Sequence, residues 1–228
     1  MKNSYKNKSL SNRIIDKLER RNRGSIKLIL FNYFYYFLSK FKKNLNDKRA
    51  YILYQINKKS IFAEVGVWKG DFSEKINKIS NPKKLILVDP WIFDEKIRGC
   101  APQVNGQEPL NQKYFDNAKS ETIKKFINCK NIQIIDNYSY EASMLFPDEY
   151  FDYIYIDGEH TYTAVTNDLN YWYPKLKKNG SIYGDDYYWR EADNSLSLHR
   201  AYQDFIYKNK IKNWCVFKSQ ICLIKNHD

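Results

Sequence analysis

The segment 151–187 restricts the fold of this 228-residue chain more than any other stretch. It contains two short apolar runs, at residues 153–156 and 181–184, separated by a helical stripe that includes Val165 and Leu169. A strand, a crossover helix and a second strand form a right-handed parallel unit, so both strands end on the same edge of a sheet. The pattern therefore predicts an α/β fold built on a parallel sheet.

Carboxylates follow both apolar runs. Asp157 comes directly after the first run, Asp185 and Asp186 come directly after the second, and His160 lies three residues beyond Asp157. Because open α/β sheets bind ligands outside the carboxyl ends of their strands, we expect these side chains to form a catalytic floor. The alternatives are a structural histidine that bonds the backbone, and a helix-capping or cofactor-contact role for the two later carboxylates.

A second strand–helix–strand pattern precedes this one. Residues 61–65 form a short apolar strand, a turn runs from Gly66 to Gly70, and a second strand, 85–88, ends on Asp89. Gly66 lets the backbone approach a ligand, Gly70 permits close helix packing, and an acid at the end of the second strand can bind ribose hydroxyls. The pattern predicts a nucleotide-binding half, with an ordinary strand-to-helix turn as the alternative.

The remaining elements complete a sheet of five parallel strands and a terminal hairpin. Asn179-Gly180 is expected to form a turn before the strand at 181–184. The other predicted elements are helices at 11–23, 26–41, 113–126 and 196–207, a helix or connector at 44–60, a long polar loop at 93–111, a strand at 132–135 and a hairpin of 214–217 with 221–225.

Positive charge is concentrated at the amino terminus. The whole chain has a formal net charge of +12, of which residues 1–50 contribute +11. We therefore divide the chain into a basic helical extension, 1–50, and a nearly neutral body, 51–228. Such an extension suits nucleic acid, anionic lipid or an acidic partner, and the simpler interpretation is a solvated helical face.

The aromatic stretch 26–41 is the one membrane candidate. It is shorter than the roughly 20 residues that a span needs, and Lys27 interrupts it, so we expect a buried or dimer-forming helix. Interfacial membrane attachment is the alternative. The four cysteines lack zinc-like spacing and no signal peptide is evident, which predicts a cytoplasmic protein, with membrane association as the alternative.

Three motifs, correctly placed on strand ends, give the chain a family resemblance. They are EVGVWKG at 64–70, VDPW at 88–91 and YIDGEHTYTAV at 155–165. With them the chain resembles the class I S-adenosylmethionine-dependent methyltransferases over residues 60–225. The resemblance implies a Rossmann-like methyltransferase fold with a mostly parallel seven-stranded sheet in the order 3-2-1-4-5-7-6, flanked by helices. The closest likeness is to a DGxH group similar to metal-dependent sugar and catechol O-methyltransferases.

The resemblance also implies roles for individual residues. The first strand and its turn would hold the methionine part of S-adenosylmethionine, Asp89 the ribose, and Trp91 and Ser139 the adenine. The implied cofactor contacts are Glu64, Gly66, Trp68, Gly70, Asp89, Trp91, Ser139 and Asp157. The resemblance further implies a Mg²⁺ site formed by Asp157, Asp185 and Asp186, with His160 as general base.

The first functional hypothesis is a magnesium-assisted O-methyltransferase that acts on a small hydroxylated molecule such as a sugar or glycan. A nucleic-acid methyltransferase is the second, although the neutral body argues against it. A non-catalytic scaffold that docks a partner or membrane through the amino-terminal helices is the third, and oxidative chemistry resembling that of cephalosporin hydroxylases is the fourth. Homo-oligomerisation is an additional expectation.

Overall fold

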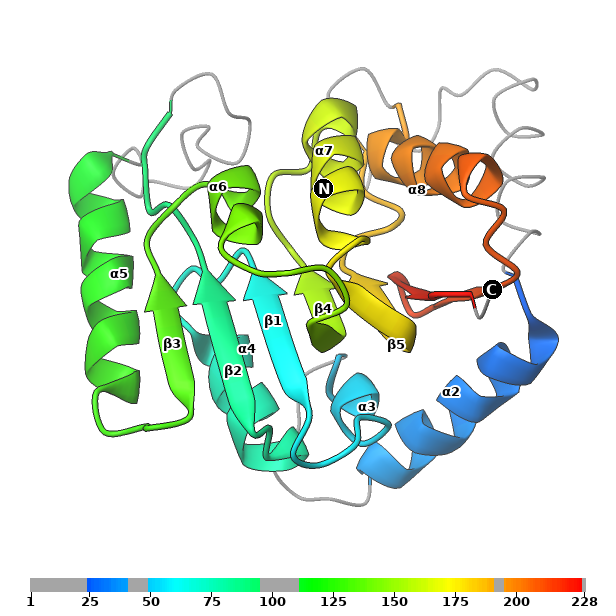
Figure 1. Ribbon diagram of the computed structural model, residues 1–228, viewed down its shortest axis with the longest axis horizontal. Coiled ribbons are helices and arrows are strands. Elements are labelled where there is room, and N and C mark those ends of the chain that lie inside the picture. Colours follow the sequence, from blue (N-terminus) through cyan, green and yellow to red (C-terminus); the bar gives the residue numbers. More distant parts are fainter. Residues whose placement is uncertain (1–23, 41–48, 95–110, 191–194, 227–228) are drawn as a thin grey trace, which may run out of the picture.

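The computed structural model describes residues 24–40, 49–94, 111–190 and 195–226. Seven strands form one sheet at its centre (Figure 1). In chain order they are β1 (Ile61–Val65), β2 (Lys84–Val88), β3 (Ile132–Ile135), β4 (Phe151–Ile156), β5 (Leu176–Gly184), β6 (Asn213–Phe217) and β7 (Gln220–Ile224).

The strand order is β3-β2-β1-β4-β5-β7-β6, which confirms the predicted fold. Strands β1 to β5 run parallel, and β7 is antiparallel to both β5 and β6. The register pairs Val65 with Val88 and with Ile156, and pairs Ile156 with Gly184. The residues that follow β1, β2, β4 and β5 therefore meet at one edge of the sheet, at the top of Figure 1.

Helices cover both faces of the sheet (Figure 1). They are α2 (Ile26–Lys40), α3 (Ala50–Leu53), α4 (Asp71–Lys75) continued by a π-helical turn, η1 (Ile76–Ser80), α5 (Gln112–Phe126), α6 (Ser139–Met144), α7 (Tyr162–Trp172) and α8 (Ser197–Lys208). Apolar side chains of α6, α7 and α8 form one half of the core, and those of α3, α4, η1 and α5 form the other.

The alternation of side chains along the strands produces these two halves. In β1, Ala63 and Val65 lie in the core beneath α7 and α8, whereas Phe62 lies in the core beneath α3 and α4. The same alternation turns Glu64 toward α4. A carboxyl group is thereby placed inside the core directly below the edge where ligands bind.

Residues Asn179 and Gly180 depart from the expected turn. They lie inside β5, which already begins at Leu176. Asn179 has a φ of 61°, and the pairing of β5 with β4 shifts register between Phe151 and Tyr153. A left-handed residue therefore produces an irregularity in a continuous strand, where the sequence predicted a break between helix and strand.

Helix α2 lies against the terminal hairpin and exposes much of its apolar surface. Its Asn32 is buried and donates to Cys215 Sγ at 3.3 Å, and its Tyr33 ring lies 4.5 Å from that of Phe217. The large exposed apolar residues of α2 are Ile26, Leu30, Phe31, Tyr33, Phe34, Phe37 and Leu38. Among the described helices none is long and apolar enough to cross a bilayer. Contact with a membrane surface or a second copy through α2 stays a prediction.

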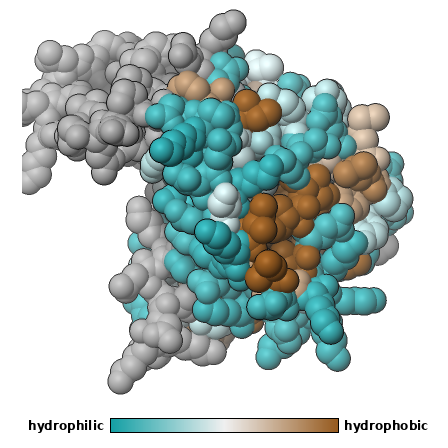
Figure 2. Space-filling view, turned by 90° about the vertical axis from the view of Figure 1, so that its left-hand side faces the viewer, coloured by the Kyte–Doolittle hydropathy of each residue, from teal (hydrophilic) through white to brown (hydrophobic). Residues whose placement is uncertain are grey.

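Apolar side chains also gather on the side of the molecule that carries α5 and the edge strand β3 (Figure 2). Ile127, just after α5, is 73% exposed, and Ile132 and Ile134 of β3 are half-buried. Homo-oligomerisation stays a prediction, and this apolar surface is one place where a second copy could bind. The helix expected at 11–23 and most of the loop expected at 93–111 lie outside the described residues.

Candidate active site

Asp89 organises the turn that follows β1. Its Oδ2 accepts hydrogen bonds from the backbone N–H groups of Val67 and Trp68, each at 2.9 Å, and its Oδ1 accepts one from Trp91 N at 2.8 Å. Burial raises the pKa of Asp89, and these three donors oppose that rise. A carboxylate offers about four acceptor positions, so Oδ1 retains room for one ligand hydroxyl. Asp89, the acid predicted to bind ribose, therefore also holds the turn at 66–70 in place.

Two tryptophans, one inside this turn and one shortly after β2, lie in opposite environments. Trp91 is only 1% exposed, and its Nε1 donates to the backbone oxygen of Trp68 at 2.8 Å. Trp68 is 36% exposed, and its ring lies 5.3 Å from that of Tyr114 on α5. The indole of Trp91 belongs to the core in this arrangement, so an adenine could stack on it only if the ring were uncovered. The aromatic surface open at the turn is that of Trp68.

Glu64 lies beneath the turn and is 2% exposed. The hydroxyl of Ser73, on α4, donates to its Oε2. Burial raises the pKa of Glu64 from 4.5 to about 8; Ser73 lowers it and the nearby Asp157 raises it further. This carboxyl group therefore supports the turn at 66–70 from within the core and is not open to solvent.

The buried position of Glu64 predicts a pH-dependent stability. A folded-state pKa above the unfolded value means that stability is full below pH 4.5 and is lost as the pH rises to about 8. The shift corresponds to a loss of about 5 kcal/mol in the free energy of unfolding. We expect Glu64→Gln to flatten this decline in chemical denaturation measured from pH 5 to 8.5. The exposed Glu121→Gln is the matched control, and an unchanged slope in Glu64→Gln would contradict the assignment.

Asp157 and Asp185 come together as predicted, but an arginine lies between them. Arg49 Nη1 is 3.0 Å from Asp157 Oδ2 and 3.2 Å from Asp185 Oδ2. The same guanidinium lies over the ring of Phe72, at 4.2 Å from its centroid. Burial raises the pKa of Asp157, whereas His160 and Arg49 lower it. The positive charge between these two carboxylates thus comes from Arg49, the residue just before α3.

Asp185 is held by several further groups. The Tyr155 hydroxyl lies 3.0 Å from Asp185 Oδ2 and 2.8 Å from Gln220 Oε1. Gln220 Nε2 donates to Asp185 Oδ1, and Asp186 N donates to the same oxygen at 2.7 Å. Both oxygens of Asp185 are therefore engaged by groups of the protein itself.

The expected magnesium site does not assemble in this arrangement. Asp186 adopts a left-handed φ of 49°, and its charge contributes to the environment of His160. Across the described ranges, no group of three His, Cys, Asp or Glu side chains is placed to hold a metal ion. Since Arg49 takes the facing oxygens of Asp157 and Asp185, the donor set does not fit Mg²⁺, which prefers near-octahedral oxygen coordination.

His160 lies beside Asp157 at the mouth of the site. Its Nε2 is 3.6 Å from Asp157 Oδ1, too long for a hydrogen bond, and its ring lies 5.0 Å from that of Trp189. Nε2 is buried and has no hydrogen-bond partner among the described residues. Burial lowers the pKa of His160, but the carboxylates of Asp157, Asp186 and Asp185 outweigh this and raise it overall. An unpartnered imidazole nitrogen beside a carboxylate is suited to proton transfer.

Ser139, the first residue of α6, takes part in a buried hydrogen-bond network. Its hydroxyl donates to Asp168 Oδ1 and accepts from Trp172 Nε1 at 2.8 Å. Burial raises the pKa of Asp168 to about 7, while Ser139 lowers it. A Cβ added to Gly158 would lie 3.5 Å from Asp168 Oδ2, so this acid lies next to the loop after β4. Ser139 is thus connected, through its hydrogen bond to Asp168, with the loop that follows β4.

Sequence reasoning missed Arg49, Gln220 and Asp168, and it gave the Tyr155 hydroxyl no role in the site. Asp168 had a signal, because it lies at helical spacing with the buried Val165 and Trp172, and an acid on an apolar stripe needs a partner. Arg49 had none, since it is one basic residue among many in residues 1–50.

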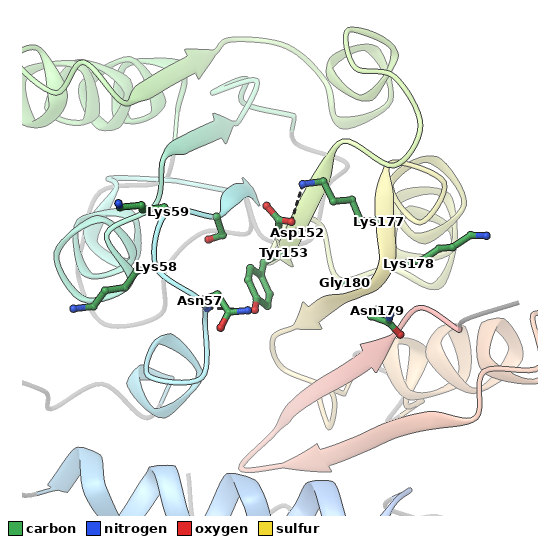
Figure 3. A pocket seen from close by; sticks show the side chains of 10 residues that line it. Asn57, Lys58, Lys59, Asp152, Tyr153, Lys177, Lys178, Asn179 and Gly180 are labelled. Carbon is green, nitrogen blue, oxygen red and sulfur yellow. Dashed lines mark hydrogen bonds and ion pairs between the residues drawn. The ribbon is translucent and has the colours of Figure 1, made fainter.

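A separate pocket lies at the opposite edge of the sheet, where β1 and β4 begin (Figure 3). It has a volume of about 280 Å³. Lys177 points toward Asp152, with which it forms an ion pair at 2.8 Å, and the ammonium groups of Lys58 and Lys59 point away from Tyr153. Its position excludes this pocket from the site built around Asp89 and Asp157.

Comparison with known proteins identifies the domain type. A family model described as a methyltransferase domain matches residues 63–187, which is more than half of the chain. An uncharacterised protein of Acanthamoeba polyphaga mimivirus is 32% identical over 131 residues, covering 55% of this chain and 51% of that protein. The chain thus spans about half the length of the curated relative it matches.

Solved structures share the fold at low sequence identity. The O-methyltransferase NovP has a TM-score of 0.55 at 15% identity, over 78% of this chain and 80% of its own. A candidate caffeoyl-CoA O-methyltransferase from Staphylococcus aureus has a TM-score of 0.55 at 14% identity, over 96% and 100%. A candidate methyltransferase from Streptococcus mutans, in complex with SAH, has a TM-score of 0.53 at 13% identity, over 77% and 94%. At these identities the likeness concerns the fold alone.

Proposed function

The chain belongs to the family of methyltransferase domains, and from this premise we propose that it transfers a methyl group from S-adenosylmethionine to a hydroxyl of a small molecule. The family match and a structural neighbour solved with SAH support the methyl donor. Structural neighbours that are named as O-methyltransferases support an oxygen acceptor. The observation that carries the proposal is His160 Nε2, an unpartnered nitrogen among the described residues, 3.6 Å from Asp157 at the ligand-binding edge.

The residues around the glycine turn fit S-adenosylmethionine. Gly66, with a φ of 89°, brings the turn close to the end of β4, and Asp89 keeps one acceptor position for a ribose hydroxyl. Trp68 offers exposed aromatic surface beside this carboxylate. The cofactor would therefore lie over the ends of β1 and β2, with its reactive end toward β4.

The acceptor would lie over the ends of β4 and β5. When bound, S-adenosylmethionine supplies an electrophilic methyl group. His160 Nε2 would take the proton of the acceptor hydroxyl as the sulfur–methyl bond breaks and the carbon–oxygen bond forms, with S-adenosylhomocysteine as the leaving group. The carboxylate of Asp157 would stabilise the imidazolium that results. Because Nε2 is buried, side chains around it would have to move to admit the acceptor. A sugar or glycan is the acceptor class we propose, in keeping with the family resemblance, and magnesium has no part in this proposal.

Replacing His160 tests the proposed base. We expect His160→Ala to lower kcat by about 10²–10⁴, the range typical for loss of a general base. The affinity of this variant for S-adenosylmethionine should stay within about twofold, because among the described residues no hydrogen bond or ion pair joins His160 to Asp89 or to the turn at 66–70. Transfer of a labelled methyl group to a panel of sugars and other hydroxylated acceptors measures the first quantity, and calorimetry measures the second. Unchanged turnover in His160→Ala would contradict the assigned base, and transfer to none of the acceptors by wild-type protein would contradict the acceptor class.

A further inference from the structure

Arg49 lies at the centre of the carboxylate cluster, where a divalent ion was expected. We propose that Arg49 is a positioning residue that takes the place of this ion, so that the proposed methyl transfer operates on a cation supplied by the chain itself. The inference rests on the proposed function for its catalytic meaning, but the occupancy of the site by Arg49 can be tested independently. The residues involved are Arg49 and its neighbours Asp157, Asp185 and His160.

The geometry gives Arg49 a bridging position. A single nitrogen, Nη1, contacts Asp157 Oδ2 at 3.0 Å and Asp185 Oδ2 at 3.2 Å. A divalent ion that joined the same two carboxylates would need those facing oxygens. Asp185 Oδ1 is already bound by Gln220 Nε2 and by Asp186 N. A metal ion and the Arg49 guanidinium therefore compete for one place.

Surrounding groups hold the guanidinium in this place. Phe72 lies under it at 4.2 Å, and the side chain of Arg49 is 23% exposed. The adjacent helix α3 is buried throughout, and the Tyr51 hydroxyl donates to Phe217 O at 3.0 Å. An arginine on a fixed backbone, stacked on an aromatic ring, loses little entropy when it binds its carboxylates.

The charge balance of the cluster also favours a fixed cation. Asp157 lies close enough to influence Glu64 electrostatically, and Asp185 lies close enough to influence Asp157. Arginine stays protonated at every physiological pH, so it supplies a permanent positive charge beside these acids without a second component. Removing one partner from such a partly buried pair leaves an uncompensated charge, which is strongly unfavourable.

Arg49 acts on the proposed chemistry through Asp157. Asp157 Oδ2 faces Arg49 at 3.0 Å, and Oδ1 faces His160 Nε2 at 3.6 Å. The guanidinium therefore fixes the rotamer of the carboxylate whose charge lies beside the imidazole. Arg49 lies outside the residues that match the family model, so the part of the chain before β1 completes this site.

Titration with Mn²⁺, followed by electron paramagnetic resonance, tests the inference on the full chain without any methyl donor. We expect wild-type protein to show no Mn²⁺ binding that depends on Asp157. Arg49→Ala should bind Mn²⁺ at least about tenfold more tightly than wild type, because Asp157 Oδ2 and Asp185 Oδ2 then lose the cation that lies between them. Arg49→Lys should behave like wild type, since one ammonium nitrogen can contact both oxygens as Nη1 does. The double variant Arg49→Ala/Asp157→Asn should lose the gained affinity.

Two outcomes would overturn the inference. One is Mn²⁺ binding by wild-type protein that Asp157→Asn abolishes, and the other is a folded Arg49→Ala that gains no affinity. Circular dichroism establishes folding, and if Arg49→Ala does not fold, the comparison of wild type with Asp157→Asn decides alone. S-adenosylmethionine binding is measured in the same preparations. If wild-type protein does not bind S-adenosylmethionine, that result counts against the proposed function, whereas the Mn²⁺ result bears only on Arg49.

Discussion

Replacing Gly66 with alanine is expected to destabilise the domain and abolish cofactor binding together. Gly66 has a φ of 89°, and an added Cβ would lie 2.1 Å from the backbone oxygen of Asp157. A side chain in the left-handed region costs about 1–2 kcal/mol, and the overlap adds a further 1–3 kcal/mol. We expect the free energy of unfolding to fall by about 3 kcal/mol or more in urea denaturation. The overlap would also separate the turn after β1 from the end of β4.

Gly158→Ala provides a matched control at the same edge of the sheet. A Cβ there would meet Asp168 Oδ2 at 3.5 Å, which is an ordinary contact. We expect this variant to stay within about 0.5 kcal/mol of wild type and to bind S-adenosylmethionine normally. Equal behaviour of the Gly66 and Gly158 variants would show that close approach of the backbone at Gly66 does not build the site.

Replacing Asp89 with asparagine is expected to have the second largest effect. The amide keeps one oxygen, so its NH₂ group must face either the N–H groups of Val67 and Trp68 or that of Trp91. Loss of charged acceptors to buried donors costs about 1.5–3 kcal/mol each. We expect the affinity for S-adenosylmethionine to fall by about 100-fold, since both the ribose contact and the shape of the turn are affected. Calorimetric titration measures this change.

Asp136→Asn is the control for Asp89→Asn. Asp136 also follows a parallel strand, β3, but its side chain is 45% exposed and pairs with Lys119 at the surface. An exposed pair contributes at most about 1 kcal/mol, so this variant should bind the cofactor as wild type does. If Asp136→Asn weakened binding as much as Asp89→Asn, the general negative charge of the edge would matter rather than the position of Asp89.

The positions of the strands could be predicted from the sequence because its signals were local and repeated, whereas the strand order was predicted from the family resemblance. Apolar runs that end on acids placed β2, β4 and β5, the glycine turn at 66–70 placed β1, and the short link at 218–219 placed the closing hairpin. The irregularity at Asn179 escaped prediction because an Asn-Gly pair is compatible with both a turn and a distorted strand. Which of the two forms depends on the neighbouring strand β4, and sequence spacing does not report that pairing.

The site was predicted in part, for a related reason. The meeting of Asp157 with Asp185 follows from the rule that parallel strands end together. The partners of these acids come from distant parts of the chain: Arg49 precedes β1 by more than ten residues, and Gln220 belongs to the last strand. Trp91 was expected to form a wall for the adenine, and packing of α5 against the turn leaves its indole in the core. Such contacts depend on tertiary packing and leave no local pattern.

Calorimetric titration of the purified full chain with S-adenosylmethionine tests the central claim most directly, because every assigned role assumes that this cofactor binds over the ends of β1 and β2. We predict saturable binding to a single site with a Kd of about 1–100 μM, within the range usual for enzyme substrates, and the same result in excess EDTA. Absence of binding at about 1 mM ligand, in protein shown to be folded, would contradict the account.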